Sequence, residues 1–365
     1  MFSEHREFSG TGKDLEISTP GRICLFGEHQ DYLGLPVIAM AISLRANMVG
    51  EKRTDQEVII HKPDIGETER FLIGDTAYQK QRDYFKSGIN ICKREGLRFS
   101  HGFECEIRSD IPIRAGTSSS SAIVVSWINF LSQMSDDPMT WTNEKIGELA
   151  YAAEVSEFQE PGGMMDQYST AIGQTVYIES EPVTSVEPLS SSLGSFVLGD
   201  SGDQKDTLSI LAHCRDMRLD ILNKIRPFNS GFDLHSCGHD LDLSILNDQE
   251  RILFKSTMDN RDLLREARTE LLGNDMDHER IGALLDQHHV ILRDHLHVST
   301  DKIERMINAA RNAGALGCKI NGSGGGGCMF AYAPNDPDAV VDAIGSVGGT
   351  AYLINADDGT KVLTS

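Results

Sequence analysis

Residues 20–32, PGRICLFGEHQDY, join an apolar strand to a glycine and a short run of polar side chains. The polar run contains Glu28, His29 and Asp31, next to Gly27, a residue type that tolerates unusual backbone angles. In a chain with 55 acidic residues, a single acid is more often a solvated surface charge. These side chains are therefore candidate site residues that need support from the rest of the sequence.

The chain outside this stretch places strands first, helices second and strands again at the end. Apolar runs bounded by turns predict strands within 15–60, over 103–113 and over 194–201. Residues 317–334 predict a strand, a glycine loop and a strand, and residues 351–363 predict a closing strand pair.

Helical patterns fill most of the remaining sequence. The segments expected to be helical are 116–134, 143–158 and most of 205–316, with long helices at 243–273 and 278–314. The order of elements indicates an α+β protein with two lobes. The boundary is placed between residues 185 and 186, within the proline- and serine-rich stretch 181–194.

The composition limits the possible partners. The 365 residues include 34 Lys or Arg and 55 Asp or Glu, and the formal net charge is −21. Such a chain repels nucleic acid and anionic membranes, so we expect neither as a partner. The seven cysteines form no CxxC pair, which disfavours a disulfide framework and fits a reducing compartment. Because the first residues contain no apolar signal segment, we expect a cytoplasmic protein.

Residues 116–122, GTSSSSA, open the helix predicted over 116–134. Small residues at a helix start leave backbone N–H groups unpaired, let a phosphate approach closely and add the positive end of the helix dipole. A serine hydroxyl there could also bind Mg²⁺. The loop lacks the Gly-Lys-Ser/Thr ending of a Walker A motif, and a serine-rich cap without a ligand is the alternative.

Residues 319–328, KINGSGGGGC, contain five glycines between apolar flanks. A strand hairpin needs only two loop residues, so this many glycines favours close approach of the backbone to a ligand. Two further acids also lie near glycines. Glu154 falls late in the helix expected over 143–158, and Asp166 follows the turn in GGMMDQ, residues 162–167.

Together, and in this order, these stretches resemble the motifs of the GHMP kinases, most closely those of the galactokinases. Residues 20–32 are similar to the galactokinase signature PGRVNLIGEHTDY. Residues 111–122 resemble the family's phosphate loop, and 153–167 keep its spacing between a glutamate and a Met-Asp-Gln triplet. Residues 317–328 resemble the third family motif, so the resemblance spans residues 18–330.

The resemblance implies a two-lobed GHMP kinase fold with ATP between the lobes and Mg²⁺ as the metal. The N-terminal lobe, 1–185, would resemble ribosomal protein S5 and carry the sugar signature, the phosphate loop and the catalytic aspartate. The C-terminal α/β lobe, 186–365, would carry helices over an antiparallel sheet and the glycine-rich third motif. Whether the protein is a monomer or a homodimer stays open.

The resemblance also implies a role for each matching residue. Asp166 would accept the proton of the substrate hydroxyl or orient that hydroxyl, and Arg22 would stabilise the transferring charge. Mg²⁺ would be held by Ser120 and Glu154. The implied substrate-binding residues are Glu28, His29, Asp31 and Gly163. The implied ATP-binding residues are Gly116, Thr117, Ser118, Ser119, Ser120, Ser121, Gly324 and Gly325.

The implied reaction is transfer of the γ-phosphoryl group of ATP to the anomeric hydroxyl of a hexose, with D-galactose as the first expectation. The alternatives are a GHMP kinase for N-acetylgalactosamine, fucose, arabinose, a uronic acid, a heptose or mevalonate, and a sensor of sugar and ATP without turnover. Glu28 and Asp31 disfavour mevalonate because two acids would face a carboxylate substrate.

The sequence departs from the galactokinase pattern at two places. Leu33-Gly34-Leu35 replaces the usual Asn and Gly after the signature tyrosine. Residues 198–211, LGDSGDQKDTLSIL, lack the tyrosine that galactokinases place against the sugar.

Overall fold

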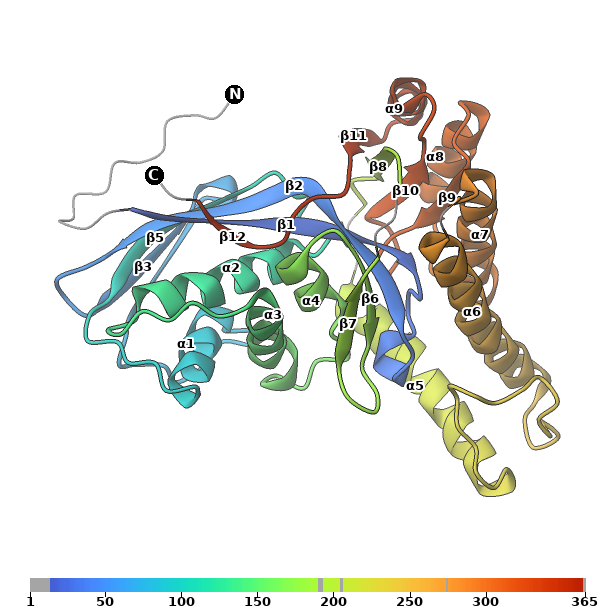
Figure 1. The fold of residues 1–365 in the computed structure, drawn as a ribbon, viewed down its shortest axis with the longest axis horizontal. Coiled ribbons are helices and arrows are strands. Elements are labelled where there is room, and N and C mark those ends of the chain that lie inside the picture. The colour runs from blue at the N-terminus through green and yellow to red at the C-terminus, as the bar shows by residue number, and fades with distance from the viewer. Residues whose placement is uncertain (1–13, 114, 190–192, 204–205, 274, 364–365) are drawn as a thin grey trace.

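The computed structural model describes residues 14–363 apart from 114, 190–192, 204–205 and 274. Figure 1 shows two lobes, one built on a long sheet with helices on one face and the other on a smaller sheet packed against helices. The predicted two-lobed α+β architecture is therefore confirmed.

The sheet of the first lobe has eight strands in the described residues, in the order β12-β1-β2-β5-β3-β4, with β6 pairing β2 and β7 pairing β6. The strands are β1 (Leu15–Phe26), β2 (Val37–Lys52), β3 (Glu57–Lys62), β4 (Glu67–Leu72), β5 (Phe103–Ser109), β6 (Thr175–Glu179), β7 (Ser185–Pro188) and β12 (Lys361–Leu363). The β3–β5 pair is parallel and the others are antiparallel. The short strands expected within 15–60 thus merge into the long β1 and β2.

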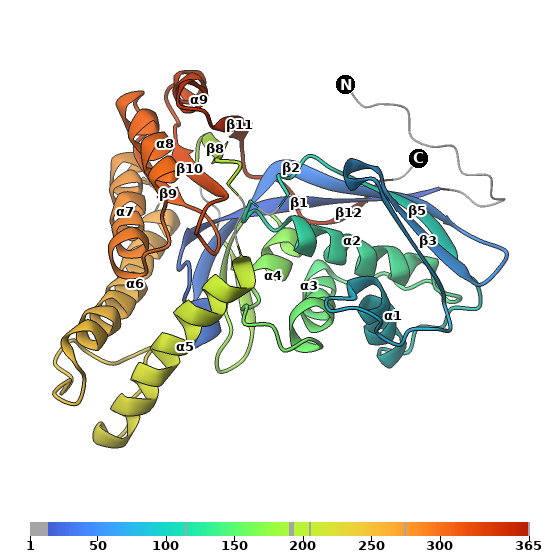
Figure 2. The same cartoon turned by 180° about the vertical axis from the view of Figure 1, so that it is seen from behind.

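Helices cover one face of this sheet (Figure 2). They are α1 (Tyr84–Arg94), α2 (Ser119–Met134), α3 (Asn143–Tyr151) and α4 (Met165–Ile172). Trp127 of α2 is fully buried at the centre of this layer, stacks on Phe130 at 5.6 Å and donates to the Phe85 carbonyl at 3.0 Å. The helix predicted over 116–134 is confirmed, and it begins at Ser119.

The second lobe has a four-stranded antiparallel sheet in the order β11-β8-β10-β9. Its strands are β8 (Phe196–Asp200), β9 (Gly317–Ile320), β10 (Cys328–Tyr332) and β11 (Thr350–Ile354). Its helices are α5 (Thr207–Ile225), α6 (Asp248–Leu272), α7 (His278–Val290), α8 (Asp301–Asn312) and α9 (Pro337–Ser346). No helix in the described ranges is long and apolar enough to cross a bilayer.

Two helical predictions need correction. The helix expected over 278–314 is interrupted after His295, where the chain leaves its helical path so that the Val298 carbonyl can accept from the backbone N–H of Gly325. The helix expected over 143–158 changes after Tyr151 into a π-helical turn, Ala152–Ser156. A π-helical turn changes the direction of the side chains that follow it, and such turns are frequent at functional sites.

The end of the chain also differs from the expectation. Residues 351–363 do not form a strand pair, because β11 joins the second sheet whereas β12 returns to pair with β1. The eight-stranded sheet therefore contains strands from both sides of the 185/186 boundary, which itself falls within β7. The division into residues 1–185 and 186–365 stays a prediction.

The returning C-terminal segment is held by a buried cluster of hydroxyl groups and an amide. Thr360, which is 3% exposed, shares a hydrogen bond of 2.8 Å with Thr19 and accepts from Asn129 at 3.2 Å. Thr19 in turn accepts from Ser126 of α2 at 2.8 Å. The cluster ties the last strand to the main sheet and to its central helix.

We expect Thr360→Val to lower the free energy of unfolding by about 1–3 kcal/mol, because it keeps the shape and leaves buried polar groups unpaired. Denaturant melts would measure the loss. The control is Thr350→Val on an exposed position of β11, which should change stability little. Equal effects in the two variants would contradict the role assigned to the cluster.

Candidate active site

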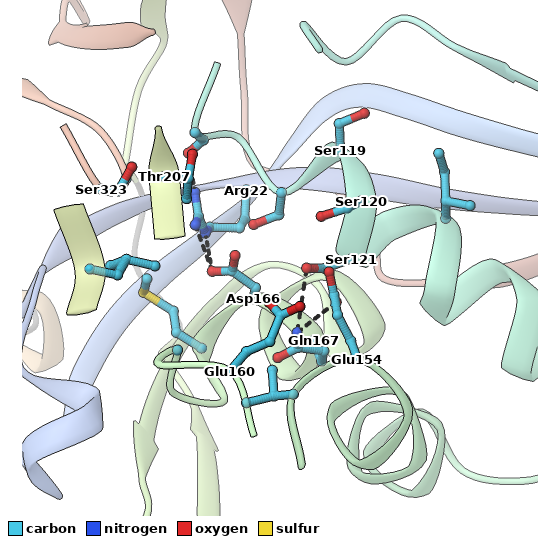
Figure 3. Close-up of a pocket in the computed structure, with 18 of the residues that line it drawn as sticks. Arg22, Ser119, Ser120, Ser121, Glu154, Glu160, Asp166, Gln167, Thr207 and Ser323 are labelled. Carbon is cyan, nitrogen blue, oxygen red and sulfur yellow. Dashed lines mark hydrogen bonds and ion pairs between the residues drawn. The ribbon is translucent and has the colours of Figure 1, made fainter. Parts of the chain in front are cut away.

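A cavity of about 420 Å³ lies between the two lobes. Its walls come from the end of β1, the loop before α2, the start of α4, the start of α5 and the glycine-rich loop after β9. Figure 3 shows how side chains from these separate elements converge on one space. Most of the residues predicted for the site line this cavity.

Arg22 and Asp166 form an ion pair in this cavity. The Arg22 Nε and Nη2 atoms lie 2.9 and 2.6 Å from Oδ1 of Asp166 (Figure 3). The Nη1 atom of Arg22 donates to the Gly116 carbonyl. Burial opposes the charge on the guanidinium, but Asp166 and Glu28 outweigh this effect and raise the pKa of Arg22. The Asp166 side chain stays 32% exposed, so its carboxylate can still meet a ligand.

The loop before α2 has the geometry of an anion site. Gly116 and Ser118 adopt left-handed backbone angles, φ 85° and 61°, and the sixteen-residue helix starts directly after them. The unpaired N–H groups of its first turn therefore open toward the cavity with the positive end of the helix dipole. The residues of this loop that line the cavity are Gly116, Ser118, Ser119, Ser120 and Ser121. Thr117 is fully buried and does not line it.

Glu154 comes from the π-helical turn and lies on the same side of the cavity. It is 3% exposed, accepts from Gln167 Nε2 at 2.7 Å and has no ion-pair partner among the described residues. Burial raises the pKa of Glu154, while hydrogen bonds from Gln167, Ser121 and Ser120 act in the opposite direction. A buried carboxylate beside a serine hydroxyl is an oxygen donor set that suits Mg²⁺.

Glu28 and His29 connect the end of β1 to the glycine-rich loop. Oε2 of Glu28 lies 2.9 Å from Lys319 Nζ and accepts from the Gly322 N–H at 3.0 Å. The His29 ring bonds to the Tyr32 hydroxyl at 2.9 Å and to the Ser323 carbonyl at 3.1 Å. Both predicted residues line the cavity, and both also hold its walls together.

Asp31 lies in direct contact with Gly163. Its Oδ1 accepts from the backbone N–H of Tyr32 at 2.9 Å, and a Cβ atom added to Gly163 would lie 2.1 Å from its Oδ2. Burial, followed by the nearby Asp166 charge, raises the pKa of Asp31 to about 6. Glycine is therefore required at position 163 so that this carboxylate can occupy the cavity wall.

The glycine-rich loop meets the cavity through fewer residues than the sequence predicted. Gly322 and Ser323 line the cavity. Gly324 and Gly325 instead pack on neighbouring segments, where an added Cβ would lie 2.4 Å from Val298 and 2.3 Å from Ile210, respectively. The ATP contact expected of these two glycines stays a prediction.

Sequence reasoning missed Asn321, a fully buried residue that joins three motifs. Its Oδ1 accepts from the Cys24 N–H at 2.9 Å, and its Nδ2 donates to the Gly116 carbonyl at 2.8 Å. An asparagine beside glycine is common in any turn, so only its burial identifies it. Reasoning from sequence also missed Arg218 of α5, whose guanidinium lies 5.1 Å from the Tyr32 ring and donates to its hydroxyl.

One end of the cavity is apolar and was not predicted either. It is lined by isoleucines from the first lobe, namely Ile65, Ile107, Ile113 and Ile123. Isolated isoleucines in or beside strands and helices look like core residues in a sequence, so no signal marked them as site residues.

We expect Gly163→Ala to raise the KM of a substrate that binds against Asp31 by roughly tenfold or more, because the new methyl group must displace this side chain. Steady-state kinetics with each substrate varied in turn would measure the effect. The neighbouring Gly162→Ala is the matched control, since a Cβ there meets nothing within 4 Å. Similar KM values in both variants would show that the contact between Gly163 and Asp31 does not affect substrate binding.

Three protein-family models match this chain. The model described as GHMP kinases N terminal domain matches residues 83–174, and GHMP kinases C terminal matches residues 263–349. The model described as Galactokinase galactose-binding signature matches residues 3–52.

Relatives of two kinds cover nearly the whole chain. The mevalonate kinase of Thermococcus gammatolerans is 32% identical over 92% of this chain and 94% of its own. The galactokinase of Limosilactobacillus fermentum is 26% identical over 92% of this chain and 90% of its own.

Solved structures of the same two kinds share the fold. Lactococcus lactis galactokinase in complex with galactose has a TM-score of 0.86 at 20% identity, over 98% of this chain and 97% of its own. Methanococcus jannaschii mevalonate kinase has a TM-score of 0.72 at 17% identity, over 96% and 100% of the two chains.

Proposed function

This chain belongs to the GHMP kinases, which use ATP to phosphorylate an alcohol group, and we propose that it phosphorylates the anomeric hydroxyl of a hexose, with D-galactose as the first candidate. The product would be galactose 1-phosphate. The match of residues 3–52 to a galactose-binding signature supports this choice among the alcohols that the family uses.

The observation that carries the proposal is the carboxylate of Asp31 beside the Arg22–Asp166 pair. Asp31 has no ion-pair partner in the described part of the chain, and it lines the cavity. A carboxylate accepts hydrogen bonds and a sugar hydroxyl donates them, so a neutral polyol matches this wall. A substrate that itself carries a carboxylate would meet like charge there.

In the proposed reaction, Asp166 and Arg22 would position the acceptor hydroxyl and the γ-phosphoryl group of ATP. The acceptor hydroxyl would lie against Asp166, which either takes its proton or orients it for attack on the γ-phosphorus. Arg22, already paired with Asp166, would face the charge that develops on the transferring group. Phosphoryl transfer depends mainly on such positioning and charge stabilisation.

The residues that would hold Mg²⁺ are Ser120 and Glu154. The metal would supply positive charge to the phosphate oxygens of ATP. Gln167 holds the Glu154 carboxylate in place through its 2.7 Å hydrogen bond. The backbone of residues 116–121 would bind the phosphates, and the apolar end lined by isoleucines would accept the base.

Mevalonate is the second candidate, because relatives that cover most of this chain at about 30% identity are mevalonate kinases. A coupled ADP-release assay with Mg²⁺ and ATP would compare galactose with N-acetylgalactosamine, fucose, arabinose, glucuronate, a heptose phosphate and mevalonate. We expect the highest kcat/KM with galactose. Asp166→Asn should lose roughly 100-fold or more in kcat while still binding ATP, because it keeps the shape and loses the charge.

Turnover of mevalonate above every sugar would overturn the proposed acceptor and leave the kinase chemistry intact. Near-normal kcat in Asp166→Asn would overturn the role of that residue. ATP binding without turnover of any acceptor would instead favour the alternative that the protein is a sensor of sugar and ATP.

The raised pKa of Asp31 predicts a pH dependence that Asp31→Asn should remove. In the wild-type protein the KM of the sugar should rise as the pH falls through about 6. Protonation of Asp31 removes one hydrogen-bond acceptor for the sugar hydroxyls. Kinetics between about pH 5 and 8 would measure both profiles. Identical profiles for the variant and the wild type would exclude Asp31 as the titrating group.

The same shift predicts an effect on stability. The folded protein binds the Asp31 proton more tightly than the unfolded chain, so this group's contribution favours folding at low pH and is lost as the pH rises through about 6. Asp31→Asn should therefore raise the Tm of the ligand-free protein at neutral pH, and this gain should shrink as the pH falls.

A further inference from the structure

A second cavity, of about 280 Å³, adjoins the proposed acceptor site. The two cavities share a strip of wall that includes Asp31, Tyr32 and Gly163. An acceptor bound against Asp31 would therefore lie next to this second space. Nothing in the reaction of a single hexose with ATP makes use of it.

The walls of the second cavity come from segments far apart in the sequence. Besides the shared strip, they include Tyr151 at the end of α3, Ser180 and Glu181 after β6, and Arg215 of α5. Long-range packing therefore assembles this space from both lobes.

The departure of residues 33–35 from the galactokinase pattern builds part of this wall. Gly34 has a φ of 83°, and a Cβ added there would lie 2.7 Å from the carboxyl carbon of Glu181. Leu35 is buried, and with Leu33 it packs into the apolar cluster formed by α5 and α6. The two leucines anchor the turn, and the glycine between them lets Glu181 reach the cavity.

The polar groups around this cavity suit a neutral, hydroxylated ligand. Arg215 donates through Nε to Asp216, and its other two nitrogens have no hydrogen-bond partner among the described residues. The carboxylates of Asp31 and Glu181 provide acceptors, and they outnumber this one cation, which disfavours an anionic group. The rings of Tyr32 and Tyr151 add apolar surface, as is common in sites for small molecules.

We propose that the second cavity is a subsite for a second neutral sugar, so that the acceptor is a disaccharide phosphorylated at the free anomeric hydroxyl of its reducing-end hexose. The inference rests on the proposed function, because the reducing-end hexose would occupy the site beside Asp31 and Asp166. The second sugar would lie between Tyr151, Glu181 and Arg215.

The test compares galactose with disaccharides of two galactose units, linked 1→2, 1→3, 1→4 or 1→6, in the ADP-release assay. We expect one linkage to exceed galactose in kcat/KM by roughly tenfold or more. Turnover of galactose without that gain for any linkage would overturn the subsite and leave the hexose kinase standing. Turnover of mevalonate alone would overturn both proposals. A gain in kcat/KM over galactose that is seen only with N-acetylgalactosamine would overturn the proposal that the second cavity binds a second sugar.

Variants of the cavity wall test where the second sugar binds. Ser180→Trp should fill the cavity and lower the ratio of disaccharide to galactose kcat/KM by roughly tenfold. Arg215→Ala should lower the same ratio without filling the space, which keeps the test valid if the tryptophan variant does not fold. Ser185→Trp, on an exposed position of β7, is the control and should keep the wild-type ratio. An unchanged ratio in both wall variants would overturn the subsite.

Discussion

The arrangement of this site depends on the buried ion pair between Glu28 and Lys319. Glu28 follows β1 in the first lobe, whereas Lys319 lies on β9 in the second, and their side chains are almost completely removed from water. Burying two charges is costly unless further polar groups complete their hydrogen bonding. Here the Gly322 N–H also donates to Glu28, and Lys319 also donates to the Cys24 carbonyl. Loss of either ion would leave an uncompensated charge, at a typical cost of about 3–5 kcal/mol.

Around that pair, hydrogen bonds to shared backbone groups bring the three motifs together. The Gly116 carbonyl accepts from both Arg22 and Asn321, which belong to the first and third motifs. The backbone N–H of Arg22 also donates to the Thr117 carbonyl at 3.2 Å. These contacts hold the loop before α2 and the Arg22–Asp166 pair in one geometry. A reaction that depends on positioning benefits from such a preformed frame.

The carboxylates that line the cavity limit which groups could bind beside them. A protein with a formal net charge of −21 gathers Asp31, Glu154 and Asp166 in one space, and Arg22 pairs with only the last of them. Each of the other two is partly or fully buried, and each has a raised pKa. Burying a carboxylate without a partner costs free energy. A metal beside Glu154 would offset this cost by supplying positive charge, and a hydroxylated acceptor beside Asp31 would offset it by supplying hydrogen-bond donors.

Local patterns in the sequence were enough to predict the two-lobed α+β architecture and a helix over 116–134, which begins at Ser119. Motifs with fixed spacing also indicated part of the cavity wall, including Arg22 and Asp166. The sequence by itself did not determine the break after His295, the return of β12 to the first sheet or the bridging role of Asn321. Each of these depends on a partner far away, and that partner lies 205 residues away for the bond from Asn321 to Gly116. No local pattern could predict them, since a buried polar group takes its partner from whatever the fold brings within hydrogen-bonding distance.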